Sequence, residues 1–177
     1  MNLWQEVFQD LINRGLSRVF VFVTDNFSGL NKLLKKFFPL SDHQLFFVPF
    51  ARNLRNQLSP KVSKKAIAIW KRIKMAYDYD EGSKLYDELL SLVEDNKADY
   101  AKYLKKYKEN YLNFLKYPED IRKYVYTTNI VESINSGLER MKYDVGGYFG
   151  FMKTIEINLF VQLINLNDSW LTKPILF

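Results

Sequence analysis

The segment Arg18-Val-Phe-Val-Phe-Val-Thr24, followed directly by Asp25, decides the fold class of this chain. A continuous run of β-branched and aromatic residues is typical of a strand buried on both faces, in a sheet covered by helices. A second such run, His43-Gln-Leu-Phe-Phe-Val48, comes after a short predicted helix over residues 30–37. Since an amphipathic helix is also predicted over residues 1–14, the chain opens as helix, strand, helix, strand, which indicates an α/β domain.

Helical patterns dominate the rest of the chain. Ser59 and Pro60 form a favourable N-cap and first-turn pair for a helix that reaches Ala76. The tyrosines between residues 97 and 117 repeat at helical spacing, which more often indicates packing than a surface for stacking bases. Together the predicted helices cover residues 59–76, 83–93, 97–117, 126–142 and 151–167. The expected fold class is therefore α/β and mostly helical.

Composition excludes several classes of protein. The 177 residues are 47% hydrophobic and contain no cysteine, so disulfides, zinc ribbons, iron–sulfur clusters and thiol catalysis are excluded. No apolar run approaches the roughly 18 residues of a membrane span, and the N-terminus lacks a signal-peptide pattern. We expect a soluble, cytoplasmic protein without a membrane partner.

Charge is unevenly distributed along the chain. The formal net charge is +6, but residues 30–75 hold eleven Lys or Arg and one acid, Asp42, whereas residues 76–100 hold eight acids and two lysines. Such segregation predicts a polyanionic partner for the basic segment. A solvated helix face explains the same pattern equally well on charge alone.

Two carboxylates stand at positions that favour metal chemistry. Asp25 follows a buried strand, where open α/β sheets place ligand-binding and catalytic groups. Glu132 lies in the first turn of a later helix, and two such carboxylates can hold divalent cations for phosphoryl transfer. The structural alternatives are a capping box between Asn129 and Glu132, and a turn-forming role for Asp25.

Three segments carry a resemblance to a known family. Val23-Thr-Asp-Asn-Phe-Ser-Gly-Leu30 resembles the strand-end "SDG..GL" segment of Mutator-type insertion-sequence transposases. Tyr117-Pro-Glu-Asp-Ile-Arg122 and Tyr126-Thr-Thr-Asn-Ile-Val-Glu-Ser-Ile-Asn135 resemble the family signature "YP..IR…YTTN.IES.N". Residues 4–15 are similar to the family's helix before the second catalytic strand, so the resemblance covers essentially the whole chain.

The resemblance implies a ribonuclease H-like domain with an Asp-Asp-Glu triad and an all-α insertion before the glutamate. It divides the chain into a partial α/β core (1–58), a helical insertion (59–118) and C-terminal helices that carry the glutamate (119–177). Matching positions make Asp25 the second aspartate, Glu132 the glutamate, and Asn129 the residue that positions the glutamate helix. The implied cofactor is Mg²⁺ or Mn²⁺, with Asp25 and Glu132 as its ligands.

The implied partners are the transposon ends and the target DNA, in the prokaryotic cytoplasm at the nucleoid, together with a second copy of the chain or an intact transposase. The implied reaction is hydrolysis at the transposon ends followed by strand transfer. Cations expected to contact phosphates are Arg52, Arg55, Lys64, Lys65, Lys71, Arg72, Arg140 and Lys142.

The sequence departs from the family pattern in two respects. The family's first aspartate lies upstream of the helix with which this chain begins, and neither Glu6 nor Asp10 can replace a strand-borne ligand. We therefore expect a truncated transposase that is inactive alone; the alternative is a non-catalytic remnant that binds DNA or an intact transposase. Phe46 and Pro49 stand where many members have a Cys-x-x-His pair, and no special role is predicted for His43.

Overall fold

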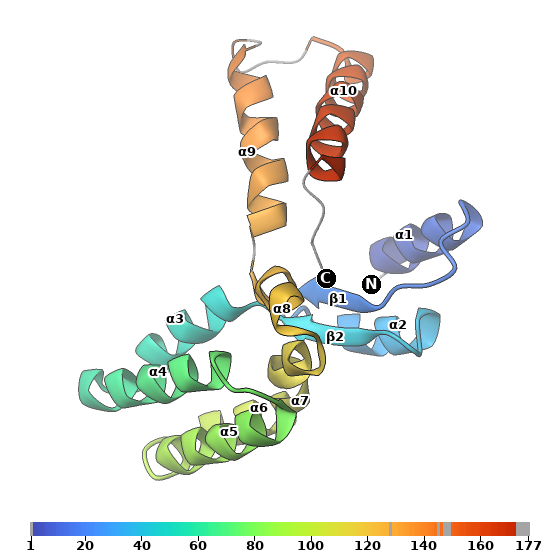
Figure 1. The fold of residues 1–177 in the computed structure, drawn as a ribbon. Helices are drawn as coiled ribbons and strands as arrows, with labels where there is room; N and C mark the ends of the chain where they lie inside the picture. Colours follow the sequence, from blue (N-terminus) through green and yellow to red (C-terminus); the bar gives the residue numbers. More distant parts are fainter. Residues whose placement is uncertain (1, 128, 145, 147–149, 173–177) are drawn as a thin grey trace. The chain divides into compact units, whose positions relative to one another are not determined.

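The computed structural model describes residues 2–127, 129–144, 146 and 150–172. They form two compact units, Met1–Tyr126 and Thr127–Phe177 (Figure 1). The first unit contains α1 (Asn2–Asn13), β1 (Val21–Thr24), α2 (Leu30–Phe37), β2 (Asp42–Leu45), α3 (Phe47–Gln57), α4 (Pro60–Lys74), α5 (Tyr79–Glu94), α6 (Ala98–Lys106), α7 (Lys108–Leu112), the 3₁₀ helix η1 (Asn113–Lys116) and α8 (Glu119–Tyr126). The second contains α9 (Asn129–Asp144) and α10 (Met152–Leu171).

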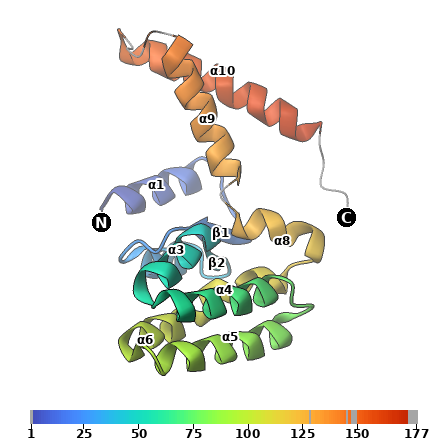
Figure 2. The same ribbon diagram turned by 90° about the vertical axis from the view of Figure 1, so that its left-hand side faces the viewer.

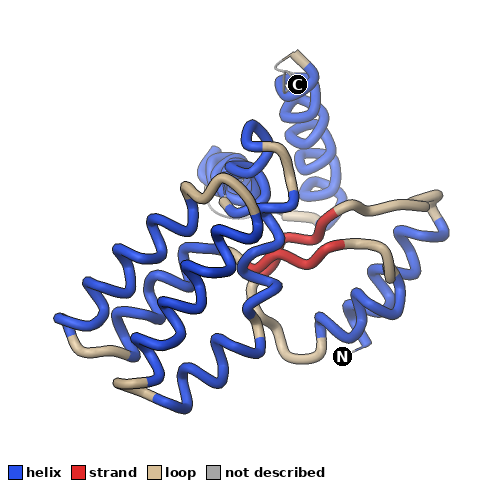
Figure 3. Tube along the Cα trace, turned by 60° about the horizontal axis from the view of Figure 1, so that its bottom comes forward, coloured by secondary structure: helices blue, strands red, loops and turns tan. Residues whose placement is uncertain are grey.

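The two strands form a parallel pair, with Thr24 opposite Leu45 at the carboxyl end. Helices lie on both sides of the pair (Figure 3). Phe22 packs against the cluster of α1 and α2, whereas Val21 and Val23 pack against the larger core formed with α3 to α8. The predicted α/β arrangement, with β1 contacted on both faces, is thus confirmed. The residues of β1 are only half-buried, because the described sheet has two strands and each strand has a free edge.

The main core lies among the helices that follow β2 (Figure 2). Helix α4 packs on α3 and α5, and α5 packs on α6. Fully buried aromatic and aliphatic side chains hold this layer together: Phe50, Leu54, Ile73, Tyr86, Leu89, Leu104 and Phe114. This large buried apolar surface makes the helical layer the chief source of hydrophobic stability in the first unit.

The prediction of a strand over residues 43–48 is wrong in its second half. The strand ends at Leu45, and α3 begins at Phe47. Phe47, Phe50 and Leu54 recur at helical spacing and are all buried, so this face of α3 joins the core. A short apolar run is compatible with either a strand or a buried helix, which explains the error.

Residues 97–117 also differ from the prediction, because three short helices replace one long helix. The break falls at Tyr107, whose backbone leaves the helical region (φ −107°, ψ 13°). Tyr100 and Tyr111 are buried in the core, which confirms that the tyrosine repeat serves packing.

Two helix starts were misjudged from the sequence. Helix α5 begins at Tyr79 instead of residue 83, since the Asp78 carboxylate caps it by accepting from the Glu81 N–H at 2.8 Å. Helix α8 was not predicted; it begins directly after Pro118, a residue that favours the first turn of a helix.

The second unit is a pair of packed helices. Gly137 of α9 lies against the side chain of Gln162 of α10, whose amide end would have to move to accommodate a larger residue at position 137. Helix α9 starts at Asn129, within the predicted range of 126–142, and α10 contains the predicted 151–167 segment except for its first residue. In the described part of the chain, no helix is long and apolar enough to cross a membrane.

Candidate active site

Asp25 lies at the mouth of a cavity at the carboxyl end of the sheet. It directly follows β1, as predicted, and its side chain is exposed. The cavity has a volume of about 410 Å³ and is bounded by residues from both strand ends, α3, α6 and α7: Thr24, Asp25, Asn26, Leu45, Phe46, Pro49, Arg52, Asn53, Tyr103 and Tyr111. A carboxylate and a guanidinium therefore line one cavity that is open to solvent, and it could take a ligand that carries both a cation and an anionic group.

A hydrogen-bond network fixes the backbone beneath Asp25. The Thr24 hydroxyl lies 2.7 Å from the Asp25 carbonyl oxygen and 2.8 Å from His43 Nε2. The hydroxyl has one proton, so when it donates to the Asp25 carbonyl it must accept from a protonated Nε2. This arrangement ties the end of β1 to β2 and restrains the residue that bears the carboxylate.

His43 is the centre of this network, a role the sequence did not predict. Its carbonyl accepts hydrogen bonds from the side-chain amides of Asn110 and Asn113, each at 2.9 Å, and its Nδ1 lies 3.4 Å from Asn31 Oδ1. Burial, together with the nearby charge of Lys35, lowers the pKa of the imidazole below its usual value. Little in the sequence signalled this role, because His43 lies between two other polar residues, Asp42 and Gln44, at the start of the strand.

Phe46 and Pro49, at the positions matched to the family's Cys-x-x-His pair, line the same cavity as Asp25. Neither side chain can ligate a metal or exchange a proton. Polar groups line the cavity as well, and among them Asn26 donates a hydrogen bond of 2.9 Å to the Tyr103 hydroxyl. The α3 side of the cavity thus combines these two apolar residues with Arg52 and Asn53.

Glu132 lies in the first turn of α9, as predicted, and is exposed. It belongs to the second unit, whereas Asp25 belongs to the first. The side chain of Asn129 lies outside the described residues, so its positioning role stays a prediction. Within the described residues, no cluster of three His, Asp or Glu side chains forms a metal site.

The predicted phosphate contacts separate into distinct groups. Arg52 lines the Asp25 cavity, whereas Arg55, Lys64 and Lys71 line a groove of about 590 Å³ between α3 and α4. Lys65 is exposed but does not line the groove. Arg72 is bound by Glu88, with Nη1 at 3.1 and 3.0 Å from the two carboxylate oxygens, and is thereby partly neutralised.

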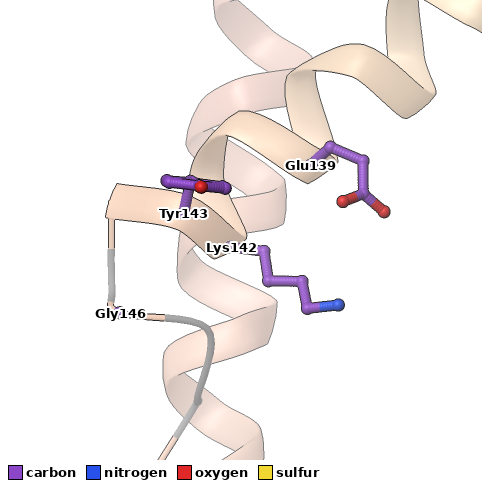
Figure 4. A pocket seen from close by; sticks show the side chains of 4 residues that line it. All are labelled: Glu139, Lys142, Tyr143 and Gly146. Carbon is purple, nitrogen blue, oxygen red and sulfur yellow. The ribbon is translucent and has the colours of Figure 1, made fainter.

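The remaining two cations lie on α9. Lys142 flanks a hollow of about 370 Å³ together with Glu139, Tyr143 and Gly146. Figure 4 shows the Glu139 and Lys142 side chains extending to the same side of the helix. Arg140 is exposed. The adjacent carboxylate makes this hollow a weaker anion site than the α3–α4 groove.

The YP..IR segment has a structural role that sequence reasoning missed. The Tyr117 hydroxyl lies 3.0 Å from Asp42 Oδ2 and 3.2 Å from the Phe20 carbonyl oxygen, which ties η1 and α8 to the sheet. Arg122 donates to the carbonyls of Tyr117, Ala76, Tyr77 and Leu115 at 2.8, 2.8, 2.9 and 3.3 Å. The motif thus joins α8 to the sheet and to the α4–α5 turn.

These features define an α/β unit with a carboxylate and a basic side chain at the end of a parallel strand pair. Residues 1–173 match the family described as Transposase, Mutator family, and the chain belongs to this family. The resemblance read from its motifs is thereby confirmed.

Curated relatives are transposases of bacterial insertion sequences. The chain is 27% identical over 139 residues to the transposase for insertion sequence element IS905 of Lactococcus lactis, covering 77% of this chain and 35% of that protein. It is 26% identical over 172 residues to the ISRM3 transposase of Rhizobium meliloti (97% and 43%), and 27% identical over 173 residues to the IS1081 transposase of Mycobacterium tuberculosis (95% and 40%). The chain thus spans less than half the length of these relatives.

Proposed function

We propose that this chain supplies two carboxylates, Asp25 and Glu132, to the metal site of a ribonuclease H-like transposase domain. The observation that supports this most strongly is the position of Asp25, which follows β1 directly and borders a cavity that also contains Arg52. Membership of the Mutator transposase family supplies the reaction class: DNA cleavage and strand transfer of an insertion sequence.

The donor chemistry of the site suits Mg²⁺ or Mn²⁺. Carboxylate oxygens are hard donors, and Mg²⁺ in proteins is held by one or two carboxylates while keeping several waters and binding substrate phosphates. When bound, such ions activate the attacking oxygen and stabilise the leaving oxygen. Asp25 would hold the ion at the strand end, His43 and Thr24 would keep the Asp25 backbone in place, and Arg52 would neutralise a phosphate.

The 177 residues alone are expected not to cleave DNA. A triad needs a third carboxylate, and the described residues bring no third acid together with Asp25. A carboxylate from a segment outside these residues would complete the site. The alternative is a non-catalytic role, in which the chain binds DNA or an intact transposase through its basic surfaces and needs no metal.

Metal titration tests the proposal. Binding of Mn²⁺ would be measured by calorimetry for the wild-type chain, for Asp25→Asn and for the control Asp99→Asn. Asp99 is also an aspartate, but its side chain is 93% exposed on α6 and pairs only with Lys102 among the described residues.

We expect Asp25→Asn to weaken Mn²⁺ binding at least tenfold, about 1.4 kcal/mol, and Asp99→Asn to leave it unchanged. Equal affinities for the three proteins would refute the metal role of Asp25. Plasmid nicking in Mn²⁺ is the second measurement: the wild-type chain should nick no faster than Asp25→Asn. Nicking that Asp25→Asn abolishes would instead show that the chain is active alone.

A further inference from the structure

The geometry points to a defined path for a DNA backbone across the first unit: from the Asp25 cavity over α3 and into the groove between α3 and α4, contacted by Arg52, Arg55, Lys64 and Lys71. This inference rests on the proposed function, since it assumes that DNA is the partner. It goes further by selecting four of the first unit's six candidate cations and leaving out Lys65 and Arg72.

The path begins where the two hollows share a helix. Arg52 lines the Asp25 cavity and Arg55 lines the α3–α4 groove, and both side chains are exposed on α3. Residues three apart lie on the same face of a helix, about 4.5 Å apart along its axis. One strand of DNA can therefore contact both arginines while one of its phosphates lies beside Asp25.

The groove continues the path along α4. Lys64 and Lys71 are seven residues apart and line the groove together with the apolar surface of Pro60, Ile67 and Ala68. Seven residues are almost two helical turns, so the two lysines lie on one face with about 10 Å between them along the axis. About three nucleotides of one strand, at 3.4 Å each, span that distance.

Charge pairing on α4 separates this face from the neighbouring one. At 100° per residue, Lys65 and Arg72 lie roughly a quarter turn round the helix from Lys64 and Lys71. Neither they nor Lys61 line the groove. Arg72 on that side is bound by Glu88 of α5. Among the described residues, none of the four cations on the path takes part in an ion pair, so their charge is available to a phosphate.

The occupant is DNA because the groove combines spaced cations with an open shape. Phosphate contacts by Lys and Arg give affinity that falls with salt and carries no sequence information. The hydroxyl of the buried Ser63 donates to the Pro60 carbonyl oxygen at 3.2 Å, and the other uncharged residues of the groove are apolar. The path therefore predicts binding without sequence preference, with the catalytic carboxylate at one end.

A pair of matched double variants tests the path. Lys64→Gln/Lys71→Gln removes two charges from the groove, and Lys61→Gln/Lys65→Gln removes two charges of the same type from lysines of the same helix that do not line the groove. Affinity for a fluorescein-labelled duplex of arbitrary sequence would be measured by anisotropy over a range of salt concentrations. Thermal melts followed by circular dichroism would confirm that both variants fold like the wild-type chain.

The groove variant should lower the slope of log K against log salt by about 1.8, because each lost duplex contact contributes about 0.9. At 0.1 M salt this corresponds to a loss of affinity of about 60-fold. The affinity of the control variant should fall no more than about threefold, because its lysines do not contact the DNA and salt screens their charge over the distance that remains.

Equal losses in the two variants would overturn the path while leaving DNA binding by the basic surface intact. If the wild-type chain failed to bind the duplex, or bound it without salt dependence, both the path and the proposed DNA partner would be refuted. A groove variant that no longer folded would be replaced by Arg55→Gln, which changes one exposed side chain of α3 and should lower the slope by about 0.9.

Discussion

Replacing Arg122 should destabilise the fold without affecting the proposed metal site, which would show that the YP..IR motif has a structural role. The Arg122 guanidinium group donates to four backbone carbonyls. Those of Tyr117, which follows η1, and of Ala76 and Tyr77 in the α4–α5 turn lie at 2.9 Å or less, and that of Leu115 in η1 lies at 3.3 Å. A hydrogen bond from a charged donor contributes about 1.5–3 kcal/mol net. Since the side chain is only half-buried, we take about 1 kcal/mol for each of the three short bonds.

Arg122→Met keeps most of the apolar stem and removes every donor. We expect it to lower the free energy of unfolding by about 3 kcal/mol, a large part of the roughly 5–15 kcal/mol available to a typical domain. Arg122→Lys should lose about half as much, because an ammonium can reach only some of the carbonyls. The control is Lys123→Met, on an exposed side chain whose ammonium lies 5.0 Å from the centroid of the Tyr124 ring. It should cost less than about 1 kcal/mol.

Urea unfolding followed by far-ultraviolet circular dichroism gives these free energies. If Arg122→Met cost no more than Lys123→Met, the four carbonyls would be satisfied by water after the mutation and the structural reading of the YP..IR motif would be wrong. A large loss in Arg122→Met with unchanged Mn²⁺ affinity would place this residue in the fold and outside the metal site.

Two further outcomes follow from the packing and titration of the first unit. Burial lowers the pKa of His43 in the folded state, so below pH 6.5 the unfolded state binds more protons than the folded state. The free energy of unfolding should therefore fall between pH 7 and pH 5, by at most about 1.4 kcal/mol per pH unit. Urea titrations at several pH values should show that His43→Gln removes this dependence. A Cβ atom on Gly82 of α5 would overlap Leu115 Cδ1. In thermal melts, Gly82→Ala should therefore destabilise the fold by about 1–3 kcal/mol, although alanine usually stabilises a helix relative to glycine. The neighbouring control Ser83→Ala should be nearly neutral.

Much of the fold was predictable from the sequence because its strongest local signals coincide with its real elements. The β-branched run before Asp25 formed a strand, and the Ser59-Pro60 pair began a helix at Pro60. The apolar segment after residue 151 formed α10. In each case the local sequence pattern and the tertiary contacts favour the same secondary structure, and therefore the prediction from sequence is correct.

The errors arose where tertiary contacts outweighed local pattern. Phe47 continues an apolar run that resembles a strand, but its ring packs against Trp70 at 4.5 Å and against Phe114 at 5.0 Å between centroids, contacts that only the folded core supplies. Gln44 is fully buried, and its side-chain oxygen accepts from the Phe114 N–H at 2.8 Å, a bond across 70 residues within the segment where α7 gives way to the 3₁₀ helix η1. No local window contains both partners.

In the candidate site, too, the features set by local sequence were predictable and those set by tertiary contacts were not. The position of Asp25 at a strand end could be read from four or five residues, and so could Glu132 in the first turn of its helix. The grouping of cations could not, since Arg55 and Lys64 line one groove only because α3 and α4 pack together. His43 was missed for a similar reason: its four partners come from β1, α2, α7 and η1.

The proposed metal site requires that Asp25 and Glu132 bind the same metal ion, and this can be measured directly. Mn²⁺ affinity would be measured for the wild-type chain, Asp25→Asn, Glu132→Gln and the double variant, and the four values combined in a double-mutant cycle. Two ligands of one ion should be coupled, so the double variant should lose clearly less affinity than the product of the two single losses. Strictly independent effects, or no effect of Glu132→Gln, would contradict a shared site in this chain.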